Sequence, residues 1–394
     1  MELPSRVNRS TGRPPRWTPL QDPIRLRPDG GKYFRDKNAA RFPKHPLEPA
    51  IFASLQASPD LFKQGQVDIV ACGSSLGNLL RFVRRLDKPF RTLVEIVGDT
   101  VFFTRRENSP TELIPDVRGF GHTFPEAYTT WDADVKGSDC HERLIRYSFG
   151  GFRFLVRSGA DGYIKESDSG KGKEPDAFLK TANKKYVNSI LELTASLEDA
   201  SISASGATIA AHGLSVQSGG SLVDQSRLFD LKTRSALKRN EDILEEQLPR
   251  LWARQIPNFI VAYHNKGQFD DIEVHHISDK VKEWENDHRK DLSRLAALVH
   301  RIVDLLREGP HRKIEIRYHG QDILEVREAL PDAVDALSPE VKALWITEGS
   351  MKADEVLNEE DSNTLLEWKE KTSDDFTACS GSCGYCGLCG SSRV

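Results

Sequence analysis

Two charged residues, two positions apart, are the part of this sequence whose types and spacing could carry chemistry. The segment LFDLKTRS (228–235) alternates as a β-strand does, so Asp230 and Lys232 project from the same face of that strand. A carboxylate in this setting binds Mg²⁺ or Mn²⁺ through oxygen, and the ion polarises a phosphoryl group and activates the attacking water. The lysine orients that water or stabilises developing charge. The pattern predicts Asp230 and Lys232 as catalytic residues, and Asp230 and Asp224 as metal ligands.

The same string also has a simpler interpretation. A strand that reads D-L-K-T-R is typical of a sheet edge, where charged side chains face solvent and bind nothing. Both interpretations treat Asp230 as a carboxylate near a strand end that contributes little to the core. We therefore expect Asp230→Ala to leave the fold intact, whether the chain is an enzyme or a non-catalytic binding module.

The elements predicted around this strand are those of a mixed α/β domain. VDIVACGSSLGNLLRFV (67–83) predicts a buried strand that leads into a helix, and residues 280–308 predict the strongest amphipathic helix. The other predicted elements are a helix over 241–255 broken at Pro249, and hairpins or paired strands over 91–107, 143–157, 256–277 and 311–329.

Several strings, in this order, resemble the motifs of the DXO-type decapping exoribonucleases, which act on the 5′ ends of RNA. That family has strands reading roughly V-x-W-R-G-x-x-T-K, G-Y-K-F-E, E-x-D and E-L-K-T, and then a G-V-P-x-I-V-x-G-F-R hairpin. The corresponding segments are VACGSSLGN (70–78), GFRFL (151–155), FDLKTRS (229–235) and QIPNFIVAYHN (255–265). The resemblance spans roughly residues 65–330. It implies a PD-(D/E)xK nuclease-like core, a mixed sheet flanked by helices.

The sequence departs from this family at positions that bind substrate and metal. Gly73 stands where the family has a phosphate-binding arginine, Leu155 stands where it has a metal-binding glutamate, and the E-x-D pair has no clear counterpart. Two functions therefore stay open. One is a diverged metal-dependent hydrolase of RNA 5′ ends; the other is a non-catalytic module that binds RNA or a protein partner. The first requires more carboxylates near Asp230, for which the candidates are Glu95, Asp99, Asp132, Asp134 and Asp161.

Four of the six cysteines form a C-x3-C-x2-C-x2-C cluster at the end of the sequence: Cys379, Cys383, Cys386 and Cys389. Four thiolates with small neighbours suit Zn²⁺ or an iron–sulfur cluster. The short loops between them would strain a mononuclear zinc site, so an exposed, redox-labile tail is the other interpretation. Neither interpretation links the cluster to Asp230.

Composition narrows the class of protein. The chain has 394 residues with 55 Lys and Arg against 59 Asp and Glu, and a net charge of −4 does not by itself indicate a charged partner. No apolar run is long enough for a membrane helix and the N-terminus lacks a secretory signal, so we expect an intracellular protein, nuclear or cytoplasmic, without a membrane partner. The expected organisation is a basic, Pro-rich flexible arm (1–46), the α/β domain (47–348), and an acidic linker with the Cys-rich tail (349–394).

Overall fold

The computed structural model describes most of the chain from residue 6 to residue 350. The described residues are 6–9, 12–57, 66–86, 88–138, 140–165, 214–217, 219–320, 322–331 and 333–350. The four clustered cysteines predicted to bind a metal lie outside the described residues, as does nearly all of the acidic linker. In the part of the chain that is described, no helix is long and apolar enough to span a membrane.

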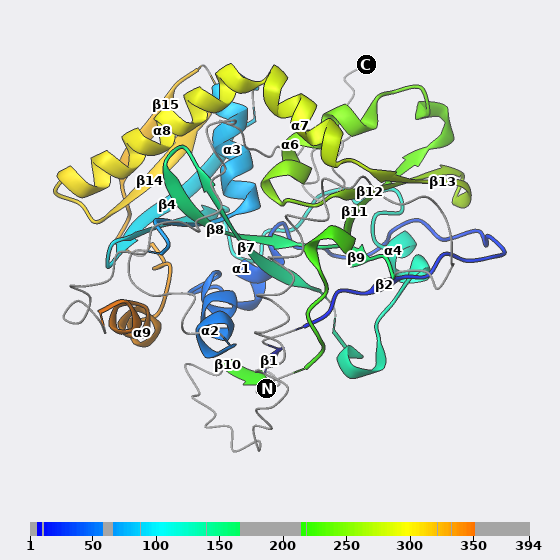
Figure 1. Ribbon diagram of the computed structural model, residues 1–394, viewed down its shortest axis with the longest axis horizontal. Coiled ribbons are helices and arrows are strands. Elements are labelled where there is room, and N and C mark those ends of the chain that lie inside the picture. Colours follow the sequence, from blue (N-terminus) through cyan, green and yellow to red (C-terminus); the bar gives the residue numbers. More distant parts are fainter. Residues whose placement is uncertain are drawn as a thin grey trace, which may run out of the picture.

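A mixed sheet of seven strands, the larger sheet, forms one half of the fold (Figure 1). β5, β3 and β8 run parallel to one another, and the other neighbours are antiparallel. All four residues of β3 are buried, because this central strand is covered on both faces. The strand order is β15 (Leu324–Glu328), β14 (Lys313–Tyr318), β4 (Phe90–Val97), β5 (Thr100–Arg106), β3 (Ile69–Cys72), β8 (Phe152–Gly159) and β7 (Glu142–Phe149).

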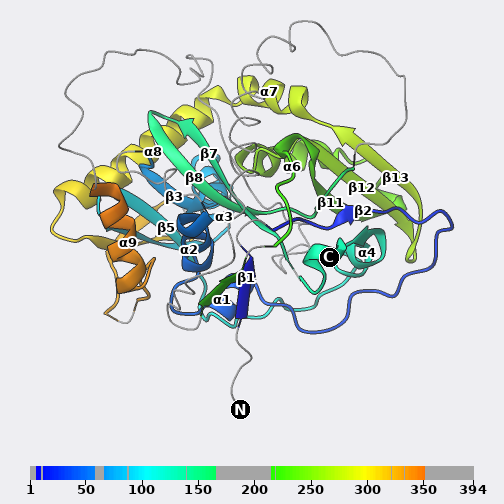
Figure 2. The same cartoon turned by 60° about the horizontal axis from the view of Figure 1, so that its bottom comes forward.

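Helices cover both faces of the larger sheet. α3 (Gly73–Val83) and α8 (Arg289–Glu308) pack on one face, and α2 (Glu48–Ala57) and α9 (Pro339–Ser350) pack on the other (Figures 1 and 2). Strand alternation divides the buried side chains between the two faces: Ile69 and Ala71 join the cluster with α3 and α8, while Val70 joins the cluster with α2 and α9.

A six-stranded mixed sheet, the smaller sheet, lies beside the larger one (Figures 1 and 2). Its β11 carries Asp230, pairs parallel with β12, and meets β9 antiparallel over Leu228 and Phe229. β11 is therefore an interior strand, and the sheet-edge interpretation of LFDLKTRS is wrong. The strand order is β13 (Gln268–His276), β12 (Asn258–Asn265), β11 (Leu228–Ser235), β9 (Gly162–Tyr163), β2 (Arg16–Trp17) and β6 (Thr129–Thr130).

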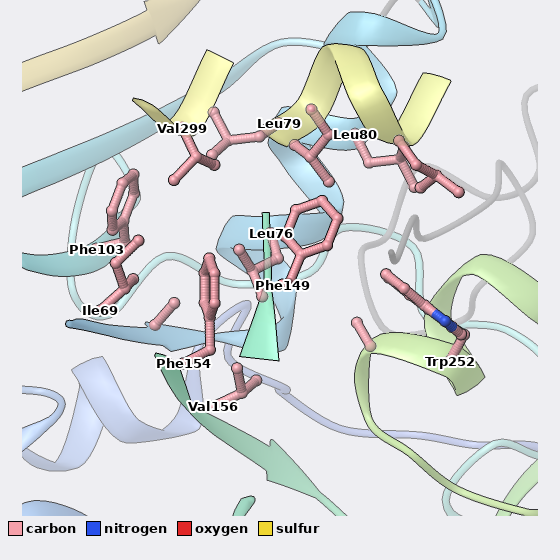
Figure 3. Packing of buried hydrophobic residues seen from close by; sticks show 14 of the residues in the cluster. Ile69, Leu76, Leu79, Leu80, Phe103, Phe149, Phe154, Val156, Trp252 and Val299 are labelled. Atoms are coloured by element: carbon pink, nitrogen blue, oxygen red, sulfur yellow. The ribbon is translucent and has the colours of Figure 1, made fainter. Parts of the chain in front are cut away.

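One hydrophobic cluster joins the two sheets. Phe259 and Val261 of β12 belong to the same cluster as Phe154 of β8. Figure 3 shows Leu76, Leu79 and Leu80 of α3 among these side chains, together with Phe154 and Trp252. The remaining described elements are α1 (Lys37–Arg41), α4 (Thr123–Tyr128), α6 (Ile243–Ala253), α7 (Ser278–Asp287), the short 3₁₀ turns η2 (Ala133–Val135), η3 (Gln225–Arg227) and η4 (Ala236–Lys238), and the parallel pair β1 (Arg6–Arg9) and β10 (Leu214–Gln217).

The predicted mixed α/β fold, the strand–helix unit at 67–83 and the four predicted strand pairs are confirmed. Two helix predictions are wrong in detail. The helix predicted over 280–308 is two helices that meet at His288, where ψ is 16°. The predicted break at Pro249 is absent, because α6 continues through it with Leu248, Leu251 and Trp252 buried, and this packing outweighs a lost backbone hydrogen bond.

The segment predicted as a flexible arm instead lies across the smaller sheet in its described part. β2 pairs with β6 and β9, and the Trp17 ring packs against Phe124, Tyr128 and Phe229. Farther along, the Asp29 carboxylate accepts the backbone N–H groups of His122 and Thr123 at the start of α4. Its few apolar residues anchor the segment although its composition is that of an exposed tail.

Candidate functional site

A cavity of about 660 Å³ opens where the parallel strands of the larger sheet end. Cys72 ends β3, Arg106 ends β5, and Arg157 of β8 lies opposite Cys72 in register. All three line the cavity, as do residues of the N-terminal segment, α6 and the loop before α4. Open α/β sheets commonly bind ligands at the carboxyl ends of parallel strands.

The lining of this cavity is cationic. Eleven Lys and Arg residues line it, against five Asp and Glu residues. The net charge of the chain does not reveal this concentration, since acidic residues elsewhere offset it. A cleft with low-dielectric walls and one sign of charge focuses its field on a ligand of opposite charge. The basic residues are Arg35, Lys37, Arg81, Lys88, Arg91, Arg105, Arg106, Arg157, Arg250, Arg254 and Arg317.

Asp230, predicted as a catalytic metal ligand, lies beneath this lining. Its side chain is 1% exposed and does not line the cavity. The Arg250 guanidinium donates to Asp230 Oδ1, and Arg254 Nη1 donates to Oδ2 over 2.9 Å. Both arginines line the cavity. Two guanidinium groups thus bind both oxygens that a metal ion would need.

Asp161 is the one further candidate carboxylate that the structure brings close to Asp230. It follows β8, and its Oδ2 accepts the Leu231 N–H of β11 over 2.7 Å. Burial, and after it the neighbouring charge of Asp230, raise the pKa of Asp161 to about 6. The Asp161 side chain lines the cavity.

Lys232, the second predicted catalytic residue, is buried beside these groups. Burial, and after it the positive charge of Arg250, lower the pKa of Lys232 to about 7, although Asp230 and Asp161 act in the opposite direction. Lys232 does not line the cavity. Asp230 and Lys232 thus lie together, as their spacing predicts, but behind the cavity wall.

Asp224, the second predicted metal ligand, lies in a different environment. Its carboxylate is exposed, caps η3 and accepts the Ser226 N–H over 2.8 Å. The other proposed carboxylates are also engaged elsewhere: Glu95 binds Lys342 and the Ala336 N–H, Asp132 binds Arg13 and Tyr163, Asp134 pairs with Arg13, and Asp99 lies in the β4–β5 turn.

The described residues do not fit the divalent metal that the resemblance implies. Mg²⁺ and Mn²⁺ need several oxygen ligands around one point. Among the described residues, no group of three or more His, Cys, Asp or Glu side chains could hold an ion. The pair that comes closest, Asp161 and Asp230, already has one carboxylate bound by two arginines.

Arg254 also lies over Gly73, the first residue of α3. A Cβ atom built on Gly73 would lie 3.6 Å from Arg254 Cγ. The sequence resemblance predicts that Gly73 occupies the position of a phosphate-binding arginine. The arginine that directly follows α6 thus lies next to this position.

Comparison with known proteins gives one family. The family described as a domain of unknown function, DUF8563, matches residues 6–327. The chain belongs to this family. No curated protein matches this DUF8563 chain.

Solved structures to which this chain is similar include Rai1 and Dxo1 proteins. Rai1 of Scheffersomyces stipitis, in complex with (3′-NADP)⁺ and calcium, is 12% identical with a TM-score of 0.47, and the match covers 76% of this chain and 79% of that chain. Rai1 of Candida albicans, in complex with pU5 and Mn²⁺, is 11% identical with a TM-score of 0.46, over 75% and 80%. Dxo1 of K. lactis, in complex with manganese, is 10% identical with a TM-score of 0.40, over 72% and 70%.

Arg250 and Arg254 are the functional candidates that the sequence reasoning missed. They lie four positions apart near the end of a predicted helix, and this spacing places them on one face. This spacing, visible in the sequence, indicates a pair of neighbouring arginines on the helix surface. The carboxylate they bind belongs to another element, and pattern alone does not identify it.

Proposed function

We propose that this chain binds the phosphorylated 5′ end of RNA in its cationic cleft and holds it without metal-dependent hydrolysis. The observation that carries the proposal is that Arg250 and Arg254 bind the Asp230 carboxylate from the cleft side. These arginines neutralise the carboxylate that would otherwise attract a metal ion. They also leave guanidinium groups, which suit phosphate oxygens, on the cleft surface.

The position of Arg254 supports a phosphate at this end of the cleft. Arg254 packs over Gly73, where the resembled family carries its phosphate-binding arginine. Arg157 lines the same wall and is held by the Pro46 carbonyl at 2.7 Å and by Glu142 at 3.2 Å. A guanidinium fixed in this way keeps its charge in place before a ligand arrives, which lowers the cost of ordering it.

Aromatic side chains in the same cleft favour single-stranded RNA. Phe34 is 40% exposed, and Tyr33 stacks on His122 with the ring centroids 3.7 Å apart. Both aromatic residues line the cleft, as does Trp131. Unpaired bases stack on such rings, whereas the bases of a duplex do not present their faces.

The test is binding of a fluorescent, 5′-monophosphorylated oligouridylate, measured by anisotropy with EDTA and with Mn²⁺. We expect binding in EDTA, and weaker binding of the same oligomer with a 5′ hydroxyl. Arg254→Ala should weaken binding of the phosphorylated oligomer about tenfold, because a hydrogen bond to a charged group is worth about 1.5–3 kcal/mol. Arg254→Lys should retain part of the affinity. Arg294→Ala, at a 64% exposed arginine of α8, is the matched control and should bind as wild type.

A hydrolysis assay on 5′-triphosphate and capped RNAs tests the second half of the proposal. The proposal predicts no product release with Mg²⁺ or Mn²⁺. The contrary result is that wild type releases product in a metal-dependent way and a folded Asp230→Asn variant does not. That outcome would reject the proposal in favour of a metal-dependent hydrolase. Absence of any RNA binding would reject both functions.

A further inference from the structure

Three arginines form a row across neighbouring strands of the larger sheet. Arg317 of β14 lies opposite Arg91 of β4, and Arg91 lies opposite Arg106 of β5. Directly opposed residues project from the same face of a sheet, and all three side chains line the cleft. Like charges in directly opposed positions destabilise a sheet, so this row needs compensating negative charge.

Glu315 supplies part of that charge. Its carboxylate accepts Arg91 Nε at 2.7 Å, Arg91 Nη2 at 3.2 Å and Arg106 Nη1 at 2.7 Å. Burial favours the neutral acid, but the hydrogen bond from Arg91 and the charge of Arg106 outweigh it and lower the pKa of Glu315. Glu315 is therefore ionised at neutral pH. One carboxylate still faces three guanidinium groups.

Arg317 is the member of the row that Glu315 does not bind. Among the described residues, the Arg317 side chain has no hydrogen bond and no ion pair, and its Nε is buried without a hydrogen-bond partner. A partly buried guanidinium in this condition has lost water contacts without gaining others, which costs free energy. An anion that enters the cleft would satisfy it.

We propose that Arg91, Arg106 and Arg317 form a second phosphate subsite, which binds a backbone phosphate of single-stranded RNA while the 5′ phosphate lies at Arg254. This inference rests on the proposed function and makes it specific: the ligand is an oligonucleotide, and a mononucleotide occupies only the Arg254 end. The two subsites belong to different parts of the fold, the end of α6 and the larger sheet, but both line one cavity. Arg317 is the member free to bind most strongly, because Glu315 holds the other two.

The experiment compares ligand length and salt dependence in the full chain. A fluorescent uridine 5′-monophosphate and a 5′-phosphorylated octauridylate are each bound to wild type, Arg254→Ala, Arg317→Ala, Arg317→Lys and the control Arg294→Ala. Arg254→Ala should weaken both ligands. Arg317→Ala should weaken only the octamer, roughly fivefold at about 0.1 M salt, and should lower the slope of log K against log salt by about 0.7, the value for one phosphate contact to a single strand. Arg317→Lys should keep the slope near that of wild type.

The outcomes separate this inference from the proposed function. If wild type binds the octamer and Arg317→Ala changes neither its affinity nor its salt slope, the subsite is rejected and the proposed function stands. If Arg317→Ala weakens the mononucleotide equally, the row belongs to the 5′-phosphate site and the second subsite is rejected. If wild type binds neither ligand, both proposals fall. Thermal unfolding of each variant identifies any loss that is due to misfolding.

Discussion

Burial shifts the proton affinity of Asp161 and Lys232 in opposite directions, and this shift has consequences for stability. The pKa of Asp161 is raised to about 6 by burial and by Asp230, so folding favours its protonated form. The stability from this group is complete below its unfolded pKa of about 3.9 and is lost as pH rises through about 6. At neutral pH the ionised Asp161 therefore weakens the fold.

Asp161→Asn should remove this penalty. The amide resembles the protonated acid, and its oxygen can still accept the Leu231 N–H. We expect the variant to exceed wild type in free energy of unfolding by about 1–2 kcal/mol above about pH 6, and to match it near pH 4. The pKa shift of Asp161 converts to about 3 kcal/mol, and we reduce this figure because the side chain is only half-buried. Urea denaturation across this pH range measures the difference. A variant less stable than wild type at pH 8 would contradict the assignment.

Asp230 also shows how far residue-scale prediction from sequence reaches. The spacing correctly placed Asp230 and Lys232 together on β11. The expectation that Asp230→Ala leaves the fold intact assumed a carboxylate near a solvent-facing strand end. Its 1% exposure and two arginine partners contradict that premise, and we now expect Asp230→Ala to destabilise the fold, because removal of the carboxylate leaves buried positive charge. Sequence alone gives the period of a strand but not its neighbours.

Helix α6 shows why the elements are easier to predict than their contacts. Its apolar spacing predicted a helix. The hairpin of β12 and β13 was predicted in the same way from its turn at Asn265–Gly267, where Lys266 and Gly267 both have positive φ. The helix still passes through Pro249, because tertiary packing overrides the local cost. That packing brings Arg250 to Asp230, a contact between elements that no single segment encodes.

The contact between α6 and β11 should behave as a coupled buried pair. Arg250→Met leaves the buried Asp230 with Arg254 alone and should lower the free energy of unfolding by about 2 kcal/mol, below the 3–5 kcal/mol for complete loss of partners. In the double variant with Asp230→Asn, part of that loss should be recovered, because the uncompensated charge is gone. A double-mutant cycle by urea denaturation measures this coupling. Additive single losses would show that the two residues do not interact.

At the scale of the whole molecule, the cleft gathers positive charge from segments that are distant in the sequence. Arg35 comes from the N-terminal segment, Arg157 from β8, Arg254 from the end of α6 and Arg317 from β14. One hydrophobic cluster contains side chains of both sheets. Repulsion among the cationic residues of the cleft therefore lowers the stability of the two sheets together. A bound polyanion should relieve the repulsion and bridge these segments.

Inorganic tripolyphosphate should therefore raise the melting temperature, and by more than sodium chloride of equal ionic strength. At a concentration of about 100 times Kd, binding adds about 2.7 kcal/mol, which amounts to several degrees for a protein of this size. Arg254→Ala/Arg317→Ala should show a smaller rise, because one charge of each proposed phosphate subsite is gone, while Arg294→Ala should rise as wild type does. Thermal unfolding followed by tryptophan fluorescence measures each shift. An equal rise in the double variant would mean that tripolyphosphate binds elsewhere and that cleft repulsion does not limit stability.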